Sequence, residues 1–163
     1  MAARPAPLPA SSLLQPHARE GHYTDCWIAD VAATVTAAPY VTAFYTSWVF
    51  KLERWILKWA IGRPSTDAEA AQLAAGTLDR FSAWRVETRA QDQIVMRDEF
   101  TRRTGSWLMA EPLPGGGTRL YFGSVVFSER DGRMGRRFSL LLGFHKLYSR
   151  ILLGAAARKL AVG

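Results

Sequence analysis

The chain has 163 residues, of which 48% are hydrophobic, with six tryptophans and a formal net charge of +7. This length fits one domain that can bury a sizeable core, and the composition excludes an intrinsically disordered chain. The single cysteine, Cys26, excludes an internal disulfide and a cysteine-rich zinc site. It is compatible with a reducing cytoplasm, where we expect the protein. Because Cys26 lies in a strand-like run, we expect a buried and inert thiol.

The positive charge is concentrated at the C-terminal end. Residues 128–163 hold eight basic and two acidic residues, whereas the rest of the chain holds 13 and 12. Such polarity attracts anionic partners, so an anionic lipid surface is one expected partner, with an ordinary solvated surface as the alternative. The chain has no RNA-binding sheet signature, zinc finger or clear helix-turn-helix, so nucleic acid is not an expected partner.

Residues 1–20 are rich in proline, alanine and serine, and proline at this density prevents a regular helix. We expect a flexible or surface-draped tail, followed by a single domain over residues 21–163. The domain opens with an extended run from His22 to Val31.

A long helix is predicted from about Thr36 to Ile61, where apolar residues recur at spacings of three and four. This stripe predicts a core helix under a sheet, with Trp48, Trp55 and Trp59 buried. The alternatives are a membrane-apposed helix or a partner-binding helix, including a homodimer that uses surface tryptophans such as Trp48 or Trp55.

Glycine ends the long helix, and a second, short helix follows. Gly62 is a natural stop for the first helix. Thr66 and Glu69 have the spacing of a capping box, so the second helix is predicted to start at Thr66 and to end at Gly76.

Four alternating runs between Phe81 and Phe127 predict antiparallel strands with one polar face. The glycine-rich segment at residues 112–117 suits a hairpin connection. It is only a weak phosphate-loop signal, because no lysine-serine or lysine-threonine pair follows, so nucleotide binding is not expected. We expect the apolar face of the strands to line a pocket through Trp84, Met96, Trp107 and Phe122.

A second long apolar helix, from about Arg137 to Leu160, closes the chain. On a helical wheel Phe144, His145 and Tyr148 fall on or near its apolar side, opposite Lys146 and Arg150. We therefore predict that His145 and Tyr148 face the sheet and, with Phe144, line the pocket. A satisfied core histidine is the alternative to a ligand-binding one.

Asp98 shares a strand face with Met96, so it is a candidate pocket acid, an ion-pair partner or a strand-end residue that reaches water. With His145 and Tyr148 it forms the candidate catalytic group. No metal site is predicted, because the three histidines lack a paired carboxylate-histidine spacing, and no cofactor is expected.

Three arginines, Arg133, Arg136 and Arg137, precede or open the last helix. Helix starts attract anions through free amides, and guanidinium groups add charge-assisted hydrogen bonds. These residues are the anion-binding candidates, with a solvated basic loop as the alternative.

Taken in order, these segments resemble the START-like, or polyketide-cyclase-like, helix-grip superfamily (SRPBCC), and in particular its small bacterial members. The residues that carry the resemblance lie at 23–28, 81–86, 105–108, 119–123 and 143–150. It implies an α+β fold in which a curved antiparallel sheet of five to seven strands grips a long C-terminal helix, with a helical arm between the first and second strands.

This resemblance constrains function only loosely, because the superfamily includes lipid carriers, hormone receptors, cyclases and chaperone cofactors. We expect a non-enzymatic or weakly catalytic binder of an apolar, lipid-like or aromatic small molecule, held between the sheet and the C-terminal helix. The alternatives are a cyclase-like or hydratase-like enzyme that uses His145, Tyr148 and Asp98, and a dimeric interaction module.

Overall fold

The computed structural model describes residues 2–62, 64–127 and 136–162, without the side chains of 60, 61, 136–146 and 162. Its elements, in chain order, are β1 (Arg4–Pro5), α1 (Gln15–Arg19), β2 (Tyr23–Val31), α2 (Ala37–Tyr45), α3 (Trp48–Ile61), α4 (Asp67–Ala75), β3 (Arg80–Phe81), β4 (Trp84–Arg89), β5 (Gln93–Asp98), β6 (Thr104–Pro112), β7 (Thr118–Val126) and α5 (Arg136–Val162).

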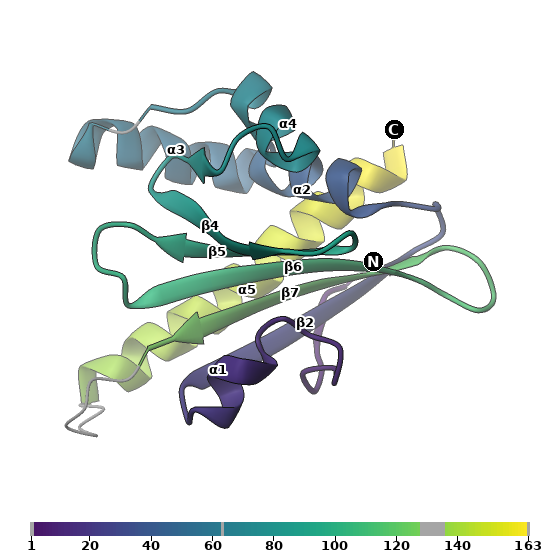
Figure 1. The fold of residues 1–163 in the computed structure, drawn as a ribbon, viewed down its shortest axis with the longest axis horizontal. Coiled ribbons are helices and arrows are strands. Elements are labelled where there is room, and N and C mark those ends of the chain that lie inside the picture. The colour runs from purple at the N-terminus through teal and green to yellow at the C-terminus, as the bar shows by residue number, and fades with distance from the viewer. Residues whose placement is uncertain (1, 63, 128–135, 163) are drawn as a thin grey trace.

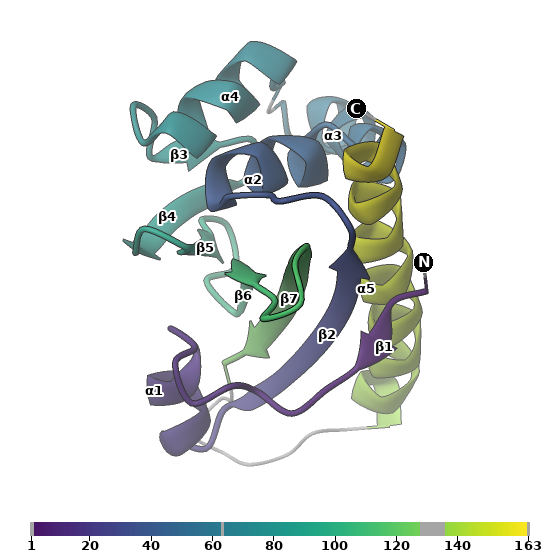
Figure 2. The same ribbon diagram turned by 90° about the vertical axis from the view of Figure 1, so that its right-hand side faces the viewer.

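Seven strands form one antiparallel sheet in the order β1-β2-β7-β6-β5-β4-β3. Helix α5 lies across one face of the curved sheet, and α1 lies on the opposite side (Figure 1, Figure 2). Helices α2 to α4 form an arm between β2 and β3. The predicted fold class, an α+β sheet that grips the C-terminal helix, is confirmed.

Strand register divides the sheet residues between two faces. Met96 is paired with Ser106, and Val95 with Trp107. Met96 and Phe122 belong to the core cluster that includes α5, whereas Trp107 belongs to a second cluster on the outer face. The expectation that Trp107 shares a pocket with Met96 is therefore wrong, because neighbouring residues of a strand point to opposite faces.

The N-terminal segment covers this outer face. Leu14 is fully buried against it, and Leu13 packs at its margin. The side chain of Gln93 ties the segment down, since its oxygen accepts from the Leu13 N–H at 3.0 Å and from the Trp107 indole at 2.8 Å. Gly123 makes room here, because a Cβ at this position would lie 2.8 Å from the Trp107 ring.

The predicted long helix is two helices. It breaks at Thr46 and Ser47, where the Ser47 hydroxyl caps α3 by accepting from the Phe50 N–H at 3.3 Å. The break turns α3, so that Phe50 is buried and the tryptophan stripe faces outward. Trp48, Trp55 and Trp59 are 66%, 61% and 71% exposed, and the prediction that they are buried is wrong.

The predicted helix ends are confirmed. Thr66 and Glu69 form a complete capping box at the start of α4. Gly62 and Gly76 end α3 and α4 in the left-handed conformation that glycine adopts without strain.

Substitution of Trp107, which is buried, and of Trp59, which is exposed, tests these two assignments. Trp107→Ala should lower the free energy of unfolding by about 3 to 5 kcal/mol, because it empties a buried site and removes a bond to Gln93. Trp59→Ala should change it by less than about 0.5 kcal/mol. Urea denaturation measures both, and equal effects would contradict the assignment.

Cys26 is buried on the outer face, as predicted, and burial, with a smaller effect of Asp25, raises its pKa to about 12. Since only the thiolate reacts, the folded protein at pH 8 should react with Ellman's reagent about a thousandfold more slowly than the unfolded chain. Similar rates with and without denaturant would contradict this.

Candidate functional site

The interior between the sheet and α5 is apolar at one end and more polar at the other. Near the C-terminal end of α5, Leu152, Leu153 and Ala156 are buried in the apolar core cluster. Toward the start of α5, Trp84 and Tyr148 are only half-buried beside that cluster. Polar groups gather at this second end. We call it the interior polar site, and it comprises Tyr45, Glu53, Trp84, Ser106 and Tyr148.

Glu53 is the centre of this site. It projects inward from α3, and its carboxyl accepts a short hydrogen bond from the Tyr148 hydroxyl of α5. Burial raises the pKa of Glu53, and the Tyr148 hydroxyl and then the nearby Trp84 N–H oppose that rise only in part. Burial, followed by the Glu53 charge, raises the pKa of Tyr148. Both shifts favour the neutral forms of the pair.

Two further donors face the same region. The Tyr45 hydroxyl lies beside Ser106, and the Trp84 indole N–H lies beside Glu53. Within the described part of the chain, neither buried atom has a hydrogen-bond partner at ordinary geometry. Buried donors are almost always bonded in native proteins, so this pair marks a place where an acceptor would be stabilised.

A polar row on the sheet adjoins the site. Asp25 pairs with Ser124, and Ser124 pairs with Ser106, across β2, β7 and β6. The Asp25 carboxylate accepts from the Ser124 N–H at 3.0 Å and from its hydroxyl at 2.5 Å. Ser106 therefore lies between the Asp25–Ser124 pair and the Tyr45 hydroxyl.

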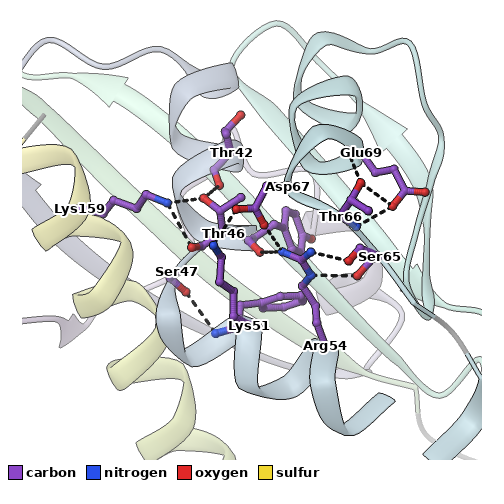
Figure 3. A network of polar contacts seen from close by, with 12 residues as sticks. Thr42, Thr46, Ser47, Lys51, Arg54, Ser65, Thr66, Asp67, Glu69 and Lys159 are labelled. Atoms are coloured by element: carbon purple, nitrogen blue, oxygen red, sulfur yellow. Dashed lines mark hydrogen bonds and ion pairs between the residues drawn. The ribbon is translucent and has the colours of Figure 1, made fainter. Parts of the chain in front are cut away.

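Arg54 fixes the rotation of α3 and so the direction of Glu53. Its guanidinium, which is 10% exposed, bonds Asp67 at 2.6 Å and both the hydroxyl and the carbonyl of Ser65, at 2.9 and 2.5 Å (Figure 3). Lys51 bonds the other oxygen of Asp67 at 2.6 Å. These bonds, that of Lys51 first, lower the pKa of Asp67.

A second contact joins α5 to the corner between α2 and α3. Lys159 donates to the Thr46 hydroxyl at 2.6 Å and to its carbonyl at 3.1 Å (Figure 3). The hydroxyl of Thr46 in turn donates to the Thr42 carbonyl at 2.6 Å. The break that reorients α3 is therefore anchored to the C-terminal helix.

The predicted catalytic group divides between different partners. Tyr148 bonds Glu53, whereas Asp98 accepts from the Phe100 and Thr101 N–H groups at 2.8 and 3.1 Å and from the Thr101 hydroxyl. Asp98 thus closes a turn at the strand end. The side chain of His145 lies outside the described residues.

The remaining predicted residues fall in several places. Trp84 lies in the interior polar site, and Met96 and Phe122 are buried in the core cluster beside it. Four further predicted site residues have side chains outside the described part of the chain, namely Arg133, Arg136, Arg137 and Phe144.

Sequence reasoning missed Glu53 and Tyr45. Glu53 lies off the tryptophan stripe that the sequence predicts to be buried. A signal was available: Phe50, Glu53 and Leu57 share one side of α3, and that side becomes the inner one once the helix breaks at Ser47.

No protein-family model and no curated protein matches the chain. Among solved structures it is similar to a structural-genomics target from Rhodobacter sphaeroides, with 15% identity, 98% of this chain and 95% of that chain covered, and a TM-score of 0.42. It is also similar to Ara h 8.0201, with 7% identity, 83% and 98% covered, and a TM-score of 0.38. Function therefore has to follow from the residues of this chain, an α+β protein with a helix-grip architecture.

Glu53→Gln tests the buried carboxyl. Because the folded pKa is raised above the unfolded value of about 4.3, wild type binds more protons when folded, and it loses stability as the pH rises between the two values. The variant cannot ionise. Its free energy of unfolding, relative to wild type, should therefore increase from about pH 4 to pH 8. A difference in stability between Glu53→Gln and wild type that is constant with pH would refute the burial effect.

Proposed function

We propose that the protein binds an apolar small molecule that carries a hydroxyl or carbonyl group, and that the interior polar site holds that group. The observation that carries the proposal is the inward carboxyl of Glu53, which lies among two tyrosines and a tryptophan. Ligand sites in proteins typically combine an apolar lining with a few convergent polar groups.

The donors and acceptors of the site define the ligand's polar end. The Tyr45 hydroxyl and the Trp84 N–H can both donate to a ligand oxygen. A ligand hydroxyl can in addition donate to Glu53. A ligand carboxylate is disfavoured, since no cation is among the residues of the site and an unpaired charge is costly to bury.

The apolar part of the ligand would lie against aromatic surface. Trp27 and Trp84, on the inner face of the sheet, are half-buried against the core cluster. Flat, lipid-like or aromatic molecules suit such walls, because aromatic rings supply a large contact area. Catalysis is not part of this proposal, since Tyr148 and Asp98 bind separate partners.

Displacement of Nile red, an uncharged dye sensitive to its environment, tests the proposal. The protein should enhance its emission, and apolar alcohols or ketones should compete with it. Tyr148→Phe and Glu53→Gln should each weaken binding by about tenfold or more, because each loses a bond to a polar or charged group.

Tyr121→Phe is a matched control, since the Tyr121 hydroxyl also bonds a glutamate, Glu111, at 2.5 Å, but on the outer face of the sheet. It should leave dye binding unchanged. Trp59→Ser should also leave it unchanged, which excludes dye bound to the exposed tryptophans. Absence of any displaceable signal, or an equal loss in Tyr121→Phe, would count against the proposal.

A further inference from the structure

The outer side of α3 is an exposed apolar stripe. It carries five large side chains that are each more than half exposed: Trp48, Leu52, Trp55, Ile56 and Trp59. Helix α5, which packs against α3, adds Leu147 at 55% and Ile151 at 37% exposure. Monomeric proteins seldom expose apolar residues in such a group, so the stripe marks a contact surface.

Apart from Glu53, the charged residues of these two helices are all basic. Helix α3 contains Lys51, Arg54 and Lys58 and one acid, Glu53, which is turned inward. The sequence of α5 contains six basic residues and no acid. Lys58 lies 5.6 Å from the centre of the Trp59 ring, so cation and tryptophan are presented together.

A groove opens beside the stripe. It has a volume of about 620 Å³ and is lined by Ser47, Trp48 and Lys51 at the start of α3 and by Arg158 and Lys159 of α5, among other residues. Three cations and an exposed tryptophan thus border one hollow, and of these cations Lys51 also pairs with Asp67. An anionic head group would be neutralised there while its chains contact the apolar stripe.

We propose that α3 and the adjoining surface of α5 dock on an anionic lipid bilayer, with the tryptophans at the level of the head groups. Tryptophan favours that interface, and amphipathic helices with basic flanks lie in it. A second copy of the chain is the less suitable occupant, because a two-fold contact would place these basic helices against each other with no acid between them.

Binding to vesicles tests the proposal, with wild type compared on phosphatidylcholine alone and on an equimolar mixture with phosphatidylglycerol. Sedimentation should show binding only to the mixture, and added salt should weaken it. Brominated lipid chains should quench tryptophan emission. Equal binding to both vesicles, or binding to neither, would overturn the proposal.

Two double variants of equal charge locate the surface. Lys58→Glu with Arg158→Glu should weaken binding by at least about thirtyfold, since each cation near an anionic surface contributes about a fivefold gain. Arg19→Glu with Arg85→Glu makes the same change in net charge away from α3 and α5, and should have a much smaller effect. Equal losses would mean that net charge, not this surface, drives binding.

The apolar part is tested by Trp55→Ser with Trp59→Ser, which should weaken binding by at least about tenfold without lowering the melting temperature. Phe100→Ser, an exposed aromatic in the loop after β5, is the control. If the tryptophan variant instead converts a wild-type dimer to a monomer in light scattering, and vesicle binding is unchanged, a second copy is the occupant and the proposal fails. Glu53→Gln should leave vesicle binding unchanged, so this inference and the proposed function fail independently.

Discussion

The orientation of α3 depends on Arg54. This side chain is almost fully buried, and it joins α3 to the start of α4 through Asp67 and both oxygen atoms of Ser65. Rotation of α3 about its axis would break these bonds, so they hold the helix in this orientation. One consequence is that Glu53 faces the interior. The other is that the tryptophans face outward, so the interior polar site and the exposed stripe both depend on the same contact.

The buried carboxyl opposes stability. Burial raises the pKa of Glu53, which means that the ionised group is less stable inside the protein than in water. Tyr148 and Trp84 reduce this cost without removing it. The adjoining donors of Tyr45 and Trp84 lack partners of ordinary geometry among the described residues. Buried polar groups that lower stability in this way are typical of binding sites. They distinguish this end of the interior from the apolar, closely packed end near Leu153.

The two faces of the sheet are covered by different parts of the chain. The outer face is closed by the chain's own N-terminal segment, with Leu14 and Trp107 at its centre and Gln93 as the polar link. The inner face meets α5 and the helical arm. The interior polar site therefore lies on the opposite side of the sheet from the segment that covers Trp107. No helix in the described part of the chain combines the length and apolar character needed to cross a bilayer.

The sequence by itself determined the antiparallel strands β4 to β7, the capping box at Thr66, the glycine helix ends, the burial of Cys26 and the sheet that grips the last helix. These follow from local periodicity and backbone preference, which neighbouring residues set. Only the tertiary structure decided which side of α3 is covered, which face of the sheet holds Trp107 and where Glu53 points. Periodicity shows which residues share a face, but it does not show what lies against that face. Here the break at Ser47 and the distant partners of Arg54 made that choice.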